Sequence, residues 1–229
     1  MTTARAAAVL FDMDGLLVDS EPLWTIAEKE LARRLGGTWS PELKAAVLGT
    51  RLDVSVPVIL RWFGVADGPG EVVDATQFLA ERMVELFHRE LPLMPGALQL
   101  IDGVRGLGVA TGLVSSSYRV LVDAALVSIG AERFGVTVAG DEVAHSKPAP
   151  DPYLVACAFL GVEPRHTVVL EDALSGVESG EAAGATVVAV PWGASIEATP
   201  NRPVVKSLED VDPVWLVEQV PTLNGASDA

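Results

Sequence analysis

Two carboxylates one residue apart follow an apolar run near the start of the chain. Residues 6–11 are all apolar, and Asp12-Met13-Asp14-Gly15 comes directly after them. A buried strand that ends in two acids delivers both to the carboxyl edge of its sheet, where open α/β folds bind ligands. Two acids this close repel each other and attract a cation, and Gly15 permits a tight turn that presents amides to an anion. A divalent metal and a phosphate would satisfy this arrangement, although four such residues alone are also typical of an ordinary turn.

Polar groups that suit the same site recur further along the chain. They follow apolar runs or stand in a proline-stiffened loop: Ser115-Ser116-Ser117 after residues 109–114, Lys147 within residues 146–152, and Glu171-Asp172 after residues 167–170. Because parallel strands end at one edge of their sheet, we expect these groups to meet the first motif there. Four matches in this order favour one site over a set of unrelated turns.

The elements that must position these residues alternate between strand and helix after residue 91. We expect strands at 6–11, 109–114, 136–139, 167–170 and 186–190, and helices at 97–106, 118–129, 151–160, from 175 onward and at 213–220. This alternation predicts an α/β fold with a doubly wound parallel sheet, Rossmann-like, with right-handed crossovers. Asp151-Pro152 and a capping box at Ser175-Gly176-Val177-Glu178 are expected to open their helices. The tail at 224–229 is expected to fray.

The stretch between residues 17 and 91 reads as helices alone. The expected helices are 20–35, 41–47, 53–63 and 71–90, with Ser20 as the cap of the first. Helices alone over this length, inside a strand–helix alternation, predict an inserted all-helical cap domain. The expected division is a core of residues 1–16 and 91–229 and a cap of residues 17–90.

The order of these groups suggests phosphoryl transfer to an aspartate. Unaided hydrolysis of phosphate monoesters is so slow that an enzyme must lower the barrier by about 20 kcal/mol or more. A carboxylate nucleophile, here Asp12, divides the reaction into two easier steps. Asp14 would protonate the leaving alkoxide and then activate the water. Lys147 would stabilise charge on the phosphoryl oxygens, and Ser115 and Ser116 would grip them.

The acids also predict a metal site for Mg²⁺. A magnesium ion bridging Asp12, the backbone carbonyl of Asp14, and Asp172 would hold the phosphate beside the nucleophile and neutralise their mutual repulsion. Glu171 is the second acidic candidate, with Asp172 favoured as the direct ligand. Of the three histidines, only His145, two residues before the lysine, has a position that would suit the site.

Together these motifs resemble those of one known family. The segments that carry the resemblance are Phe11-Asp12-Met13-Asp14-Gly15-Leu16-Leu17-Val18-Asp19-Ser20, Glu21-Pro22-Leu23-Trp24 and Leu48-Gly49-Thr50-Arg51-Leu52-Asp53. The chain resembles the haloacid dehalogenase superfamily over residues 6–216, and within it the phosphatases and β-phosphoglucomutase-like members with a small helical cap. The resemblance implies a Mg²⁺-dependent phosphatase that hydrolyses small sugar or polyol phosphates through an aspartyl-phosphate. Arg51 in the cap is the candidate substrate-facing group, a solvated arginine being the alternative.

Other functions on the same fold make different demands on the sequence. The mutase-like relatives carry a histidine where this chain has Trp24 and a cap arginine where it has Leu52, so a β-phosphoglucomutase-like sugar phosphomutase is the second reading. A dehalogenase would lack the acid present as Asp14. A non-catalytic phosphometabolite-binding protein would have lost the nucleophile, the lysine or a metal acid. A nucleotide-loop ATPase would need G-x-x-x-x-G-K-[ST], which the sequence lacks.

The composition limits which classes of partner and which compartment we expect for this protein. The 229 residues include 31 acids and 16 lysines and arginines, a net charge of −15, which disfavours nucleic acid and anionic membranes. No apolar stretch approaches the ~20 residues of a membrane span, and the first residues lead straight into the expected first strand, which leaves no room for a signal peptide. The sole cysteine, Cys157, fits a reducing compartment. We therefore expect a cytoplasmic monomer that acts on a small phosphorylated metabolite.

Overall fold

A single parallel sheet forms the centre of the molecule. The computed structural model describes residues 5–48, 50–193 and 195–220. The strands, in the spatial order β3-β2-β1-β4-β5, are β1 (Ala8–Phe11), β2 (Ala110–Val114), β3 (Val136–Val138), β4 (Thr167–Glu171) and β5 (Thr186–Ala189). Every pairing is parallel, with Phe11 opposite Leu113 on one side and Leu170 on the other. The strands therefore end at one edge, as the predicted doubly wound fold requires.

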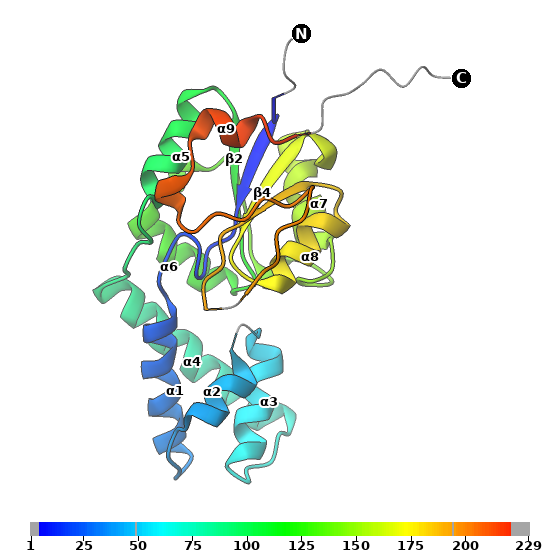
Figure 1. Ribbon diagram of the computed structural model, residues 1–229. Helices are drawn as coiled ribbons and strands as arrows, with labels where there is room; N and C mark the ends of the chain where they lie inside the picture. The colour runs from blue at the N-terminus through cyan, green and yellow to red at the C-terminus, as the bar shows by residue number, and fades with distance from the viewer. Residues whose placement is uncertain (1–4, 49, 194, 221–229) are drawn as a thin grey trace.

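Helices cover both faces of this sheet (Figure 1). They are α5 (Ala97–Gly106), α6 (Arg119–Ile129), α7 (Asp151–Leu160), α8 (Leu174–Ala182) and the short α9 (Pro213–Val217). Val9 and Phe11 of β1 are buried in the cluster that includes residues of α5 and α6, whereas Leu10 is buried with residues of α7 and α8. Alternate residues of the central strand thus face opposite layers, which explains why the whole run is apolar.

A separate helical group lies below the carboxyl edge of the sheet (Figure 1). It comprises α1 (Glu21–Arg34), α2 (Pro41–Val47), α3 (Leu52–Trp62) and α4 (Pro69–Arg89). The helices pack around buried apolar residues at helical spacing, such as Ala27 and Leu31 of α1 and Leu79 and Met83 of α4. The expected all-helical insertion into an α/β core is confirmed. Within the described part of the chain, no helix is long and apolar enough to cross a membrane.

The bounds of the expected helices and strands agree with the structure to within two residues, apart from the C-terminal end of α9. The expected last helix reached residue 220, whereas α9 ends at Val217. The capping predictions were wrong in detail. Ser20 makes no side-chain cap for α1, α8 begins at Leu174 so that Ser175 lies inside it, and α7 begins at Asp151 with Pro150 before it. The tail predicted to fray lies outside the described residues.

Candidate active site

Asp12 is the first residue beyond β1 and is almost fully buried. Its amide donates to the carbonyl of Leu170 at 3.1 Å, which continues the pairing between β1 and β4. Burial, reinforced by the nearby Glu171 carboxylate, raises the pKa of Asp12 to about 8 against an opposing effect of Lys147. The backbone thus holds the carboxylate at the sheet edge, in a place that disfavours its charge.

Lys147 reaches this carboxylate from the loop before α7. Its Nζ lies 2.6 Å from Oδ1 of Asp12, 2.6 Å from Oε1 of Glu171 and 2.8 Å from the carbonyl oxygen of Val114. Three acceptors therefore take the three protons of an ammonium group that is 3% exposed. Burial alone would lower the pKa of Lys147, but the two carboxylates outweigh it and raise that pKa. The lysine is a fixed cation between the carboxylates of Asp12 and Glu171.

Glu171 is held beside Lys147 from a second direction. The hydroxyl of Tyr153, inside α7, donates to the same Oε1, and the ammonium lies 5.0 Å from the centre of the tyrosine ring. Burial, together with the Glu171 charge, raises the pKa of the Tyr153 hydroxyl, so it keeps its proton. A β-carbon at Gly176 would lie 2.0 Å or less from the Glu171 carboxyl atoms, so only glycine fits there. This packing fixes the carboxylate that fixes the lysine.

Asp14 is oriented by three hydroxyl groups. Ser20 donates to its Oδ1 at 2.6 Å, while Ser117 and Ser115 donate to its Oδ2 at 2.8 and 3.2 Å. The serine expected to cap α1 is therefore used at the site instead, from the segment that leads into the helical group. Gly15 turns the chain with φ of +81°, and a β-carbon there would lie 2.2 Å from Oδ2 of Asp172. The turn packs the Gly15 backbone against the Asp172 carboxylate.

The acids at this edge fit a divalent cation. Asp12, Glu171 and Asp172 each offer a carboxylate oxygen within 4.8 Å of the others, and all three are buried. Burial and the charge of Asp12 raise the pKa of Asp172 to about 9. With Asp14 nearby, four acids lie at this edge with a single lysine, and the raised pKa values of Asp12 and Asp172 show that their ionised forms lack a compensating positive charge. Hard carboxylate oxygens are the ligands that Mg²⁺ and similar cations take, and the donor set suits one.

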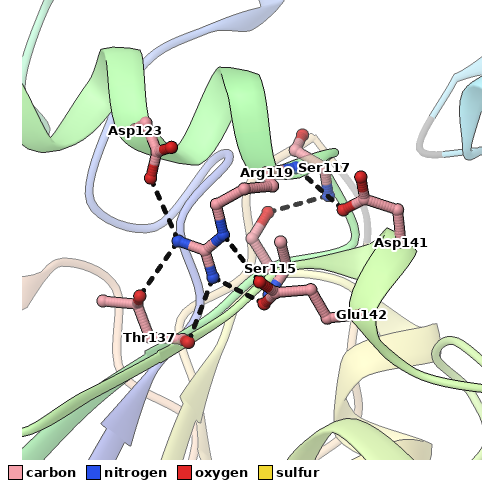
Figure 2. Close-up of polar contacts among 8 residues, drawn as sticks. Ser115, Ser117, Arg119, Asp123, Thr137, Asp141 and Glu142 are labelled. Carbon is pink, nitrogen blue, oxygen red and sulfur yellow. Dashed lines mark hydrogen bonds and ion pairs between the residues drawn. The ribbon is translucent and has the colours of Figure 1, made fainter.

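The serine loop after β2 and the first turn of α6 are hydrogen-bonded to the end of β3 and to the loop after it (Figure 2). The amide of Ser117 donates to Oγ of Ser115 at 2.9 Å, and the amide of Arg119 donates to Asp141 at 2.8 Å. The Arg119 guanidinium donates to both carboxylate oxygens of Glu142, at 2.9 and 2.6 Å, and also to Thr137. These bonds tie the first turn of α6 to the neighbouring strand, which holds the serine loop in place.

Two cavities meet at this edge. One, of about 480 Å³, is lined by core residues that include Asp12, Lys147, Asp172 and Trp192. The other, of about 110 Å³, runs among the helices α1, α2 and α3 and includes Trp24, Lys44 and Arg51. Both are lined by Asp14, Glu21, Leu48 and Ser116. A small molecule with one end at Lys147 would therefore place its other end among the inserted helices.

The remaining sequence-predicted residues divide between these regions. Arg51 precedes α3 and lines the cavity among the helices. Its side chain is 17% exposed, and its Nε lies 3.1 Å from Oδ1 of Asp53. Leu52 is buried and Trp24 is half-buried, both lining the cavity among the helices. His145 points to Asp151 at 2.9 Å with a side chain that is 75% exposed, so it belongs to the surface and not to the lysine site.

Comparison with known proteins agrees with this geometry. A model of the haloacid dehalogenase-like hydrolases matches residues 6–184. The chain belongs to the haloacid dehalogenase-like hydrolase family. It is 32% identical to hexitol phosphatase B of Escherichia coli over 194 residues, 83% of this chain and 86% of that protein. It is 30% identical to the phosphorylated carbohydrates phosphatase of Thermotoga maritima over 178 residues, 77% and 81% of the two chains.

A solved structure of the same family is also similar. A CbbY variant from Rhodobacter sphaeroides, in complex with xylulose 1,5-bisphosphate, superposes with a TM-score of 0.80 at 28% identity and covers 90% of this chain and 96% of that one. Membership of the haloacid dehalogenase-like hydrolases confirms the expected fold and the expected enzyme class, a phosphoric monoester hydrolase. Enzymes of this family generally use a divalent metal, which the acid cluster suits.

Sequence patterns alone do not indicate the roles of several residues at the site. Tyr153 looks like any apolar position of a helix, because only the fold shows that its hydroxyl meets Glu171. Trp192 follows β5 in a loop without a motif. Glu21 and Glu28 did carry a signal, since residues seven apart lie two turns along one face of a helix. That spacing predicts a pair of carboxylates on one side of α1.

Proposed function

We propose that this protein is a Mg²⁺-dependent phosphatase that hydrolyses small sugar or polyol phosphates through an aspartyl-phosphate. The observation that carries the proposal is the buried lysine that joins the first acid of the Asp12-x-Asp14 motif to Glu171 at 2.6 Å on each side. A cation fixed beside a carboxylate at a sheet edge suits a phosphoryl group, whose charge it can share. The carbohydrate phosphatases among the relatives support the substrate class.

The first half of the reaction requires a nucleophile and an acid. An oxygen of Asp12 attacks phosphorus, and the bond between phosphorus and the sugar oxygen breaks. Asp14, oriented by Ser20, Ser115 and Ser117, donates its proton to the departing alkoxide. Lys147 stabilises the charge on the phosphoryl oxygens during the transfer.

The second half reverses the roles. Asp14, now ionised, accepts a proton from water as that water attacks the phosphorus of the aspartyl-phosphate. The bond between phosphorus and Asp12 breaks, which releases phosphate and restores the free carboxylate. Ser116, which lines both cavities, and the neighbouring amides would grip the phosphoryl oxygens, while the Ser115 hydroxyl is engaged with Asp14.

A bound Mg²⁺ supplies Lewis-acid stabilisation of the phosphoryl oxygens and offsets the repulsion between phosphate and carboxylates. Asp12, Asp172 and the backbone carbonyl of Asp14 would hold it. Glu171 is the fourth acid of the set, but its Oε1 already accepts from Lys147 and Tyr153, so we assign it first to positioning the lysine. Residues 17–90 would act as the cap over a core of residues 1–16 and 91–229, with Arg51 facing the substrate.

The mutase reading has less support. A phosphomutase must hold and reorient a sugar bisphosphate and steer proton transfer, and the two positions that would serve this, Trp24 and Leu52, carry apolar side chains in the cavity among the helices. A non-catalytic binding protein is also disfavoured, because the nucleophile, the lysine and the metal acids are all present.

The proposal is tested by phosphate release from a panel of sugar and polyol phosphates, with and without Mg²⁺. β-Glucose 1-phosphate belongs in the panel, with glucose 6-phosphate followed in the same reactions. Metal-dependent release of free phosphate is the expected result. Formation of glucose 6-phosphate without phosphate release would establish the mutase instead, and no reaction with any substrate would contradict the proposed activity.

A further inference from the structure

The cavity among the inserted helices contains a lysine that is already paired. Nζ of Lys44, on α2, lies 2.7 Å from Oε2 of Glu21 and 3.2 and 3.3 Å from the two carboxylate oxygens of Glu28, both on α1. The Lys44 side chain is 16% exposed and that of Glu28 is 9% exposed. Two carboxylates share one ammonium, so this cluster has a net charge of −1.

The other cation of the cavity is paired as well. Arg51 lies with its Nε 3.1 Å from Oδ1 of Asp53. The charged residues that line the cavity are Asp14, Glu21, Glu28, Lys44 and Arg51, three acids against two bases. Among the described residues, this cavity therefore offers an incoming molecule carboxylate acceptors, the ion-paired ammonium of Lys44 and the buried Nε of Arg51, which makes no hydrogen bond, and it has no surplus of positive charge.

The position of this cavity determines which part of a substrate would meet these charges. Asp14, Glu21 and Ser116 line both this cavity and the larger one that contains Lys147. A phosphate monoester whose phosphoryl group lies at Lys147 would extend its leaving group past Asp14 toward Lys44. Hydroxyl groups can donate to Glu21 and Glu28 and accept from Lys44 without breaking their ion pairs. A second phosphate or a carboxylate would instead face two carboxylates in a partly dry cavity.

We propose that Glu21 and Glu28, by neutralising Lys44, make the enzyme select uncharged polyhydroxyl leaving groups and reject leaving groups that carry a second anion. This inference rests on the phosphatase function proposed above, and it narrows the substrate class to phosphate monoesters of neutral sugars and polyols. Bisphosphates and phosphorylated sugar acids are the excluded class.

Two substrates that differ at one carbon test the proposal. Sorbitol 6-phosphate ends in a hydroxymethyl group where 6-phosphogluconate ends in a carboxylate. For the wild-type enzyme we expect kcat/KM to favour sorbitol 6-phosphate by about tenfold or more, the size of one unfavourable charge contact. Glu28→Gln removes one carboxylate and frees Lys44, so this selectivity ratio should fall by about tenfold. Glu30→Gln is the matched control, because Glu30 lies on α1 too but pairs with Arg82 at 2.7 Å.

The readout is a ratio within one protein, so a general loss of activity does not move it. Glu21→Gln is the second variant, which should shift the ratio in the same direction if Glu28→Gln fails to fold. Equal kcat/KM for both substrates in the wild type, or an unchanged ratio in the folded glutamine variants, would overturn the inference while leaving the phosphatase intact. No hydrolysis of either substrate, nor of p-nitrophenyl phosphate, would overturn the proposed function itself.

Discussion

Nζ of Lys147 lies 2.6 Å from Oδ1 of Asp12, although 135 residues separate them in the chain. The pair is buried, and the lysine also contacts Glu171 at 2.6 Å. A buried lysine between two carboxylates remains charged, whereas burial and Glu171 raise the pKa of Asp12. The ion pair thus lowers the cost of keeping the Asp12 carboxylate ionised in a dry site.

Asp12→Asn should abolish turnover. The change replaces the nucleophile with a nearly isosteric amide, so we expect phosphate release to fall by at least about 10³-fold. The raised pKa of Asp12 means that its charge is disfavoured in the folded protein, so the variant should unfold at a temperature no lower than the wild type at pH 7. Asp210→Asn, at an exposed acid, is the control and should keep full activity. An Asp12→Asn enzyme with wild-type turnover would end the nucleophile assignment.

Removal of Mg²⁺ should silence the enzyme and also lower its stability. A metal that binds only the folded protein stabilises it by about 2.7 kcal/mol at a concentration 100 times its Kd. We therefore expect a chelator to lower the melting temperature and Mg²⁺ to restore it. Asp172→Asn should lose most of this metal-dependent shift, whereas Asp151→Asn, outside the acid cluster, should keep it. An unchanged shift in Asp172→Asn would remove that residue from the ligands.

The sequence predicts the position of a site residue where that residue directly follows a strand. Asp12, Asp172 and the serine loop each come directly after a strand of the sheet, and parallel strands bring such residues to one edge. The use of Ser20 was not predictable in this way. A serine before a helix predicts a cap, and only the path of the chain after Gly15 shows that its hydroxyl is within reach of Asp14.

Contacts between elements that are distant in the sequence could not be predicted from the sequence either. Lys147 and Tyr153 both meet Glu171, but this requires the loop before α7, the helix itself and the end of β4 in their final positions. Spacing along one element gives no access to such a contact. The pairing of Lys44 with α1 is of the same kind, because it depends on how α2 packs against α1.

Tyr153→Phe should weaken the positioning of Lys147 without removing its charge. The variant loses one hydrogen bond to a buried carboxylate, which should lower the free energy of unfolding by about 1.5–3 kcal/mol. Because Glu171 then loses a hydrogen-bond donor and holds Lys147 less firmly, we expect kcat to fall about tenfold with little change in KM. Chemical denaturation and steady-state kinetics measure the two effects. A variant that matches the wild type in both would show that the hydroxyl does not support the site.

Acidic pH should weaken the ion pair between Arg119 and Glu142, which supports the serine loop. The hydrogen bonds from Arg119 lower the pKa of Glu142, so its contribution to stability is present above the ordinary value of 4.5 and is lost as pH falls through the lowered value. Since the pair is partly exposed, we expect Arg119→Met to cost about 1 kcal/mol at pH 7. Urea unfolding of both proteins at pH 7 and in acid should show this difference shrinking as Glu142 is protonated. A difference that stays constant with pH would contradict the assignment.

Trapping the phosphorylated enzyme tests the central claim most directly. Wild-type protein is mixed with substrate and Mg²⁺, quenched in acid within one turnover, digested, and mapped by mass spectrometry. We predict one added phosphoryl group on the peptide that contains Asp12, and none on that peptide in Asp12→Asn. Rapid turnover with no phosphorylated Asp12, or with the phosphoryl group on another residue, would contradict the account.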